Sequence, residues 1–289
     1  MHVVEAKGIL SAGNGMNTYR GCSHGCIYCD SRSKCYQMNH DFENVEVKGN
    51  AKELLEGRLK SKRNKCMIGT GSMSDPYNHY EEKFRITRGC LEVINKYGFG
   101  VTLITKSNRI LEDINLIKEI NDKTKAVVQI TLTTIDDELC KKIEPNVCPT
   151  SDRFKVLMKC KELGIPTVVW LSPILPFIND SEENIGGILD LCVKADVKGI
   201  ICFGMGVTLR EGSREYFYQK LDELFPGLKD KYIRRFGNAY VCGSNNNDLL
   251  MDIFYKTCKK HHIMSNPEKI FAYLKEFPEK ETFEQLGLF

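Results

Sequence analysis

Three cysteines lie close together near the start of the chain, at Cys22, Cys26 and Cys29. Cysteine thiolates bind iron–sulfur clusters, and this spacing lets a single loop give one thiolate to each of three irons. Gly21 and Gly25 supply backbone freedom where such a loop must turn tightly. The pattern therefore predicts a loop that binds a cluster and leaves one iron open to another molecule.

Two other metal sites remain open for the same cysteines. A structural zinc ion needs four ligands and usually takes them from two short cysteine hooks, but the sequence has no second CxxC. A cluster used only for electron transfer would be expected to have four cysteine ligands. Residues able to supply the fourth zinc ligand are Cys35, Cys258, His261 and His262.

The composition indicates a reducing environment. The chain has 289 residues, and its 13 cysteines are scattered rather than packed into a short secreted scaffold. No basic segment followed by an apolar run marks a signal peptide, and no run of about 18 apolar residues predicts a membrane span. We therefore expect a cytoplasmic protein that does not enter a membrane.

The charge pattern gives little sign of a nucleic-acid-binding protein, because the net charge is only +3. One basic run covers residues 58–65. We interpret it as a solvated helix end or loop, with contact to phosphate as the alternative.

Short apolar runs alternate with stretches of helical periodicity over the first two thirds of the chain. This alternation predicts a parallel sheet with helical crossovers, either a partial (β/α)6 barrel or a doubly wound sheet. Gly98 and Gly164 follow two of the helical stretches as stop signals. The predicted strands are 16–19, 66–69, 101–105, 127–132, 167–171 and 199–203, and the predicted helices are 84–97, 110–121, 136–143, 151–163 and 181–195.

The alternation fades after residue 213. Residues 215–225, 247–260 and 266–277 have helical periodicity, and 238–242 could form a short strand. We therefore predict a barrel domain over residues 1–213 and a mainly helical extension, 214–289, that packs on it.

The cysteine loop resembles the radical SAM superfamily, whose motif is CxxxCxΦC with an aromatic residue at Φ, here Tyr28. The resemblance implies a [4Fe-4S] cluster whose open iron binds S-adenosyl-L-methionine. Reductive cleavage of that molecule would give a 5′-deoxyadenosyl radical that abstracts hydrogen from an organic substrate. It also implies the partial barrel, with the site at the C-terminal ends of the strands, and a low-potential reductant such as flavodoxin or ferredoxin.

Longer segments resemble the spore photoproduct lyase-related branch of that superfamily. They include GSMSDPYNHYE, LITKSNRI and WLSPILPFIND, and the likeness covers about residues 12–205. It implies that Ser74 and Asp75 bind the methionine ammonium group and that Lys106 binds its carboxylate. The remaining cofactor contacts that it implies are Thr131 or Thr133 at the ribose, Ser172 and Pro173 near the adenine, and Tyr28 beside the adenine or the cluster.

Two positions depart from the branch. Ser72 stands where the lyases have a cysteine that returns hydrogen, and Asp30 stands where they have a tyrosine. Both differences argue against thymine-dimer repair. The expectation of a nucleobase or nucleic-acid substrate then depends only on analogy with the branch. A small molecule or a peptide is the alternative substrate. Cys242 is a candidate hydrogen donor, as is Cys35, and Glu144 and Arg153 are expected to form a structural ion pair.

Overall fold

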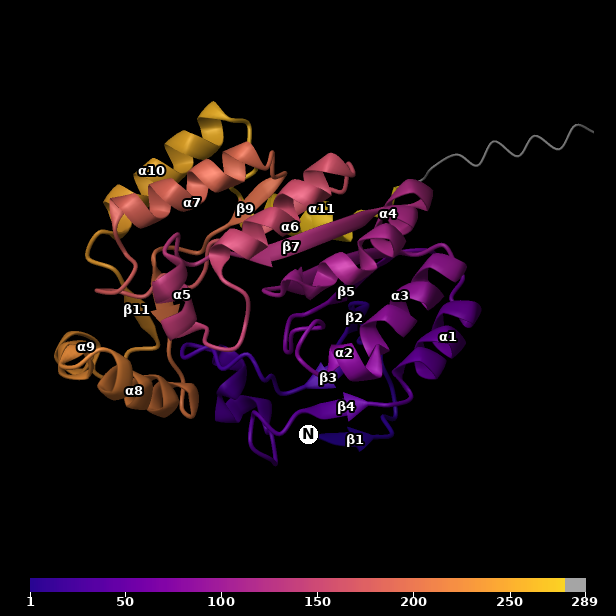
Figure 1. Cartoon of the computed structure of the whole chain (residues 1–289), viewed down its shortest axis with the longest axis horizontal. Coiled ribbons are helices and arrows are strands. Elements are labelled where there is room, and N and C mark those ends of the chain that lie inside the picture. Colours follow the sequence, from indigo (N-terminus) through magenta and orange to yellow (C-terminus); the bar gives the residue numbers. More distant parts are fainter. Residues whose placement is uncertain (279–289) are drawn as a thin grey trace, which may run out of the picture.

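The centre of the molecule is a sheet of six parallel strands (Figure 1). The computed structural model describes residues 1–278. The strands lie side by side in chain order, whereas a doubly wound sheet reverses its strand order part-way across. The fold is therefore a partial (β/α)6 barrel. Its strands are β2 (Gly15–Met16), β5 (Met67–Thr70), β6 (Gly100–Thr105), β7 (Ala126–Thr131), β8 (Thr167–Trp170) and β9 (Gly199–Ile201).

Helices connect these strands and cover the outer side of the sheet (Figure 1). Gly98 and Gly164 follow α3 (Ile86–Lys96) and α6 (Thr150–Glu162) with φ angles of 64° and 66°, so both predicted stops are confirmed. The expected helices are all present, and the one at 110–121 begins as a 3₁₀ turn (Asn108–Asp113). The barrel helices are α1 (Ala51–Ser61), which was not predicted, α2 (Glu81–Phe84), α3 (Ile86–Lys96), α4 (Ile114–Lys123), α5 (Asp137–Ile143), α6 (Thr150–Glu162) and α7 (Glu182–Lys194).

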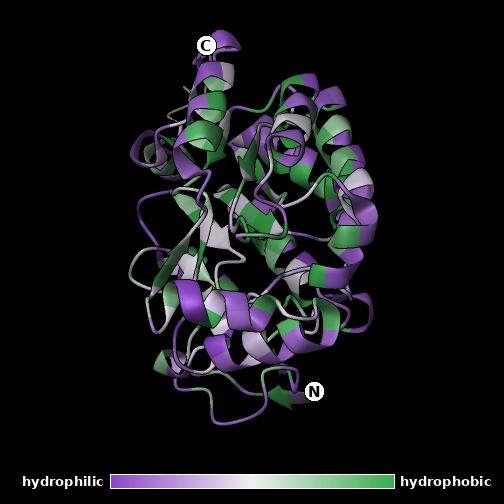
Figure 2. Cartoon of the chain, turned by 90° about the vertical axis from the view of Figure 1, so that its left-hand side faces the viewer, coloured by the Kyte–Doolittle hydropathy of each residue, from purple (hydrophilic) through white to green (hydrophobic). Residues whose placement is uncertain are grey.

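The core lies between the sheet and its helices. Every residue of β7 is buried, as in a parallel strand covered on both faces, and its buried Gln129 donates to the Thr102 hydroxyl and accepts from the Trp170 ring. The strands are mostly hydrophobic in Figure 2, while hydrophilic residues follow the outward sides of the helices. Burial on both faces fixes the sheet and therefore the positions of the strand ends.

The first predicted strand, 16–19, was wrong as a single element. The chain leaves the main sheet after Met16, and β3 (Tyr19–Arg20) belongs to a separate sheet. The two polar residues between β2 and β3, Asn17 and Thr18, account for the break in the strand. The Asn17 side chain accepts a hydrogen bond from the backbone of Met73, and the Thr18 hydroxyl lies 3.3 Å from that of Thr87.

The separate sheet has three short strands. In it, β4 (Glu46–Lys48) pairs with β1 (His2–Val4) in parallel and with β3 in antiparallel orientation. The sequence did not predict this sheet. It matters because β3 leads directly into the cysteine loop.

The C-terminal part is mainly helical, as expected. Leu250, Phe254 and Cys258 share one hydrophobic core with the barrel helices, and β10 (Gly206–Thr208) pairs with β11 (Val241–Gly243) across residue 213. The division at residue 213 stays a prediction, and residues 279–289 lie outside the described part. The helices here are α8 (Ser213–Leu224), α9 (Leu228–Phe236), which was not predicted, α10 (Asn247–Lys260) and α11 (Pro267–Lys275).

Among residues 1–278, no helix combines the length and the apolar character that a membrane crossing requires.

Candidate active site

The cysteine loop runs from β3 to a 3₁₀ turn (Asp30–Arg32). Cys22 and Cys26 are buried and Cys29 is partly buried. Gly21 and Gly25 have φ angles of 83° and 70°, as the tight turns predicted for this loop require. A Cβ atom on Gly21 would also collide with the carbonyl oxygen of Phe42. The loop therefore depends on glycine at this position.

Replacing Gly21 with alanine is expected to lower the free energy of unfolding by about 2 kcal/mol or more. A left-handed backbone costs an L-residue roughly 1–2 kcal/mol, and the collision with Phe42 adds to that cost. Urea unfolding of the cluster-free chain measures the change. The matched control is Gly13→Ala, where a Cβ meets no atom within 4 Å and a change within about 0.5 kcal/mol is expected. Equal effects in the two variants would contradict this account.

The electrostatic surroundings of the three thiols suit a positively charged partner. Burial raises the pKa of Cys22, Cys26 and Cys29, and the Lys106 ammonium acts against that rise at each of them. Buried thiolates are costly unless a cation stabilises them. Lys106 supplies one such charge, and bound iron would supply the rest.

The spacing of the thiols does not match a zinc tetrahedron. With Zn–S bonds of about 2.3 Å, zinc thiolates lie roughly 3.8 Å apart. Within residues 1–278, no set of three or more metal-binding side chains that includes a cysteine has its ligand atoms within 4.8 Å of one another.

The suggested fourth ligands lie elsewhere. Cys35 is exposed, and its sulfur accepts a hydrogen bond from Arg210. Cys258 is a buried core residue of α10, and His261 and His262 are exposed just after that helix. None of these contacts places them on the cysteine loop.

A cavity of about 930 Å³ opens beside the loop, at the C-terminal ends of the barrel strands. This is where the partial barrel was expected to place its site. Asp30 and Ser72, the two residues that depart from the related branch, also line it. The predicted cofactor residues that line the cavity are Tyr28, Lys106, Thr131, Ser172 and Pro173, together with Cys29.

Lys106 connects the cavity to the cysteine loop. Its ammonium nitrogen lies 5.8 Å from the centroid of the Tyr28 ring, a distance at which a cation is attracted to an aromatic face. Asp30 and Lys106 are the charged side chains that line the cavity within the described part of the chain. Lys106 is therefore its one cationic group there.

Ser74 and Asp75 do not line the cavity. The Ser74 hydroxyl donates to the carbonyl oxygen of Gly21, in the cysteine loop. Asp75 accepts hydrogen bonds from the Thr105 hydroxyl at 2.7 Å and from the backbone N–H of Lys106 at 2.8 Å. The two side chains thus join the cysteine loop and the end of β6 to the segment after β5.

Thr133 is also turned away from the cavity. It is fully buried, and its hydroxyl donates to the carboxylate of Glu144 at 3.4 Å. Glu144 pairs with Arg153, and both side chains are fully buried, so the expected structural ion pair is confirmed. The Tyr28 hydroxyl donates to the same carboxylate. The pair therefore holds Tyr28 in place beside the cysteines.

The candidate hydrogen donor Cys242 does not reach the cavity. Successive residues of a strand point to opposite faces, and in β11 it is Val241 and Gly243 that line the cavity. Cys242 faces a hydrophobic cluster that includes Tyr232 and Phe217, and it is fully buried there. The structure thus corrects its expected position over the barrel mouth.

Several lining residues were not predicted. Trp170 and Phe203 come from the ends of β8 and β9, and Tyr240 precedes β11. Phe203 and Tyr240 are 64% and 47% exposed, so their rings are open to a ligand. The rule that places sites at strand ends would have found Trp170 and Phe203.

Known proteins match this chain in sequence. The sequence model of the Radical SAM superfamily matches residues 16–192. An uncharacterized protein of Mycobacterium tuberculosis (strain ATCC 25618 / H37Rv) is 28% identical over 225 residues, 75% of this chain and 65% of that relative. The chain thus spans less than two thirds of the relative's length. An uncharacterized protein of Methanocaldococcus jannaschii is 33% identical over 171 residues, 59% of this chain and 64% of the relative.

Solved structures match the fold. A mutant of spore photoproduct lyase aligns with a TM-score of 0.64 and 12% identity over 91% of this chain and 80% of that chain. Another mutant of that enzyme, with bound AdoMet and dinucleoside spore photoproduct, aligns with a TM-score of 0.61 and the same identity and coverage. At this identity, the likeness is one of fold.

Proposed function

Because the chain belongs to the radical SAM superfamily, we propose that Cys22, Cys26 and Cys29 hold a [4Fe-4S] cluster and that the adjacent cavity binds S-adenosyl-L-methionine. The observation that carries the proposal is that Cys29 lines the same cavity as Tyr28 and Lys106. Cys22, Cys26 and Cys29 would hold the cluster, which would supply the electron for reductive cleavage of S-adenosylmethionine and so initiate hydrogen abstraction from a substrate. A low-potential reductant such as flavodoxin or ferredoxin would deliver that electron.

The residues that line the cavity divide the work of binding S-adenosylmethionine. Lys106 offers a cation to the methionine carboxylate, and Thr131 offers a hydroxyl to the ribose. Ser172 and Pro173 line the cavity just after β8, and we assign the adenine to them. Tyr28 packs between this region and the cysteines.

Ser74, Asp75 and Thr133 act in this proposal by positioning other groups. Their hydroxyl and carboxylate groups are engaged with Gly21, with Thr105 and Lys106, and with Glu144. The contacts of Ser74 and Asp75 with the methionine ammonium, and of Thr133 with the ribose, stay predictions.

The walls of the cavity favour a substrate with a flat ring. Aromatic side chains stack on nucleobases whatever the base sequence. Trp170, Phe203 and Tyr240 offer such surfaces. A mutant of spore photoproduct lyase, which has the same fold, was solved with a dinucleoside spore photoproduct bound, and this adds an analogy. We therefore propose an organic substrate that contains a nucleobase or a similar ring.

The basic run gives this substrate no support. Residues 58–65 end α1 and precede β5, so they lie toward the N-terminal ends of the strands, whereas the cavity lies at their C-terminal ends. Arg58, Lys60, Arg63 and Lys65 are exposed, as in the solvated helix end that we predicted.

Return of hydrogen to a substrate radical needs a donor within the cavity. Cys29 is the sole thiol among the lining residues described, and the proposal uses it as a cluster ligand. Cys35 and Cys242 lie outside, and Ser72 carries a hydroxyl. We therefore assign no protein thiol to this step, and thymine-dimer repair is not part of the proposal.

The test is formation of 5′-deoxyadenosine. The chain is reconstituted anaerobically with iron and sulfide, then given dithionite and S-adenosylmethionine, and the product is scored by mass. We expect product from the wild type and none above background from Cys26→Ala. The matched control is Cys66→Ala, a partly buried cysteine just before β5, which should keep the activity. A wild-type chain that binds one zinc ion and takes up no cluster would overturn the proposal.

A further inference from the structure

A second group of metal-binding side chains lies in the three-stranded sheet, away from the cavity. His2, His40 and Glu46 are partly buried, and their ligand atoms all lie within 4.8 Å of one another. No other group of three or more such side chains within residues 1–278 meets this limit. His2 and Glu46 are direct neighbours on β1 and β4, and His40 belongs to the loop before β4.

Hydrogen bonds determine which nitrogen of each histidine is free. His40 Nδ1 lies 2.9 Å from the carbonyl oxygen of Asp41, which can only accept, so this nitrogen must carry a hydrogen. His2 Nδ1 lies 3.3 Å from the side-chain oxygen of Asn44. Histidines that bind metals commonly donate one ring N–H to such an oxygen and bind with the other nitrogen. The arrangement leaves Nε2 of both rings for a ligand.

The contact between His40 and Glu46 calls for a cation. His40 Nε2 lies 2.8 Å from a carboxylate oxygen of Glu46. In a neutral ring that already carries its hydrogen on Nδ1, this nitrogen and this oxygen would face each other with lone pairs. Either a second proton on His40 or a metal ion removes the conflict, and a metal ion also gives the nearby His2 ring a role.

We propose that His2, His40 and Glu46 bind a divalent transition-metal ion of the Zn²⁺ type. Around tetrahedral zinc, nitrogen and oxygen ligands at about 2.0–2.2 Å lie roughly 3.3–3.5 Å apart, so small side-chain rotations suffice. Water would fill the fourth position. Arg20 Nη1 lies 3.8 Å from the Glu46 oxygen that contacts His40, while its Nη2 donates to the carbonyl oxygens of Tyr36 and Gln37, so a metal ion would share this carboxylate with Arg20.

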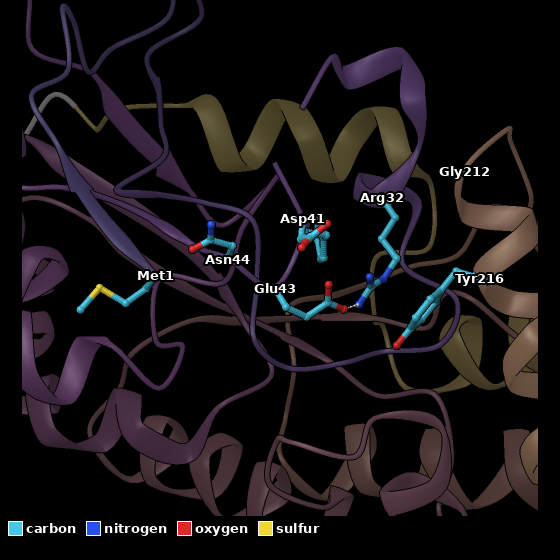
Figure 3. A pocket seen from close by; sticks show the side chains of 8 residues that line it. Met1, Arg32, Asp41, Glu43, Asn44, Gly212 and Tyr216 are labelled. Atoms are coloured by element: carbon cyan, nitrogen blue, oxygen red, sulfur yellow. Dashed lines mark hydrogen bonds and ion pairs between the residues drawn. The ribbon is translucent and has the colours of Figure 1, made fainter. Parts of the chain in front are cut away.

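A metal ion at this site would stabilise the segment before β4 that contacts the cysteine loop. The Phe42 carbonyl, two residues beyond His40, accepts the backbone N–H of Cys22 at 3.1 Å. Arg32, three residues beyond Cys29, forms an ion pair with Glu43 beside the Tyr216 ring (Figure 3). Both ends of the cysteine loop therefore contact the segment that carries His40, and a metal ion would fasten this segment to β1.

The test measures zinc binding rather than catalysis. Chain free of a polyhistidine tag is loaded with its cluster, equilibrated with Zn²⁺, desalted and analysed for zinc and iron. We expect one zinc ion per chain in addition to the cluster, and loss of that ion in His40→Ala and in Glu46→Gln. The matched control is His261→Ala, an exposed histidine at the end of α10, which should keep the zinc.

Two further measurements distinguish zinc bound at His2, His40 and Glu46 from zinc bound on the cysteine loop and from misfolding of a variant. A Cys22→Ala/Cys26→Ala/Cys29→Ala chain cannot place zinc on the cysteine loop, and it should still bind one zinc ion. If His40→Ala misfolds, Asn44→Ala serves instead, and loss of this partner should weaken zinc binding about 10- to 100-fold. The proposal fails if neither the wild type nor the triple cysteine variant binds zinc. It also fails if His40→Ala, Glu46→Gln and Asn44→Ala leave zinc binding unchanged, and His40 and Glu46 then form only an ion pair.

Discussion

Replacing Arg153 with methionine is expected to lower the free energy of unfolding by about 3–5 kcal/mol. The change leaves the Glu144 carboxylate fully buried without its cationic partner, and breaking one side of a buried ion pair has costs of this size. The hydroxyls of Tyr28 and Thr133 would still donate to the carboxylate, but neither carries a charge. Denaturant unfolding of the cluster-free chain measures the effect.

A double variant distinguishes lost charge from lost packing. Adding Glu144→Gln to Arg153→Met removes the stranded charge, so we expect most of the lost stability to return. Lys155→Met, in an exposed pair with Asp152 on the same helix, should leave the free energy of unfolding nearly unchanged. If the double variant is as unstable as Arg153→Met alone, packing of the arginine stem rather than its charge explains the loss.

The same ion pair links stability to the site. Because the Tyr28 hydroxyl donates to Glu144, the pair fixes the aromatic residue between Cys26 and Cys29. The pair also reaches the barrel, since Arg153 donates to the carbonyl oxygen of Thr131 at 3.1 Å. One buried charge pair thus sets the cysteine loop against the end of β7.

The barrel could be predicted because its signals are local. Apolar runs and glycine stops recur within short windows, and the structure has strands and helices at nearly the same residues. The three-stranded sheet has no such signal, because its strands are only two or three residues long. Its pairing of β1 with β4 also joins segments more than 40 positions apart, which no local pattern records.

The candidate site also has some features that local sequence patterns reveal and others that depend on residues distant in the chain. The cysteines lie within eight residues, so their spacing was sufficient to find them. Lys106, Thr131 and Ser172 lie at strand ends, but they were named as cofactor contacts through the resemblance to the spore photoproduct lyase-related branch. The direction of a side chain depends instead on its partners in space. Ser74 was expected to contact a ligand, but its hydroxyl binds the distant Gly21 carbonyl. The direction of the Cys242 side chain likewise depends on the register of β10 against β11, which pairs residue 206 with residue 243.

Replacing Lys106 with alanine is expected to weaken binding of S-adenosylmethionine about 10- to 100-fold in the cluster-loaded chain. A hydrogen bond between a lysine ammonium and a carboxylate contributes roughly 1.5–3 kcal/mol, and Lys106 is the one cation lining the cavity in the described chain. Titration calorimetry measures the affinity, and iron content is measured in parallel because Lys106 also favours the thiolates. The matched control is Lys155→Ala on the exposed side of α6, where no change is expected.

The pattern of loss then decides what Lys106 does. Weaker binding at full iron content places its charge on the ligand, as proposed. Loss of iron with unchanged affinity in the remaining loaded fraction would assign the charge to the thiolates alone, because burial opposes their ionisation. If Lys106→Ala changes neither affinity nor iron content, a metal-binding module without catalysis describes the chain better. The cavity would then be unrelated to S-adenosylmethionine.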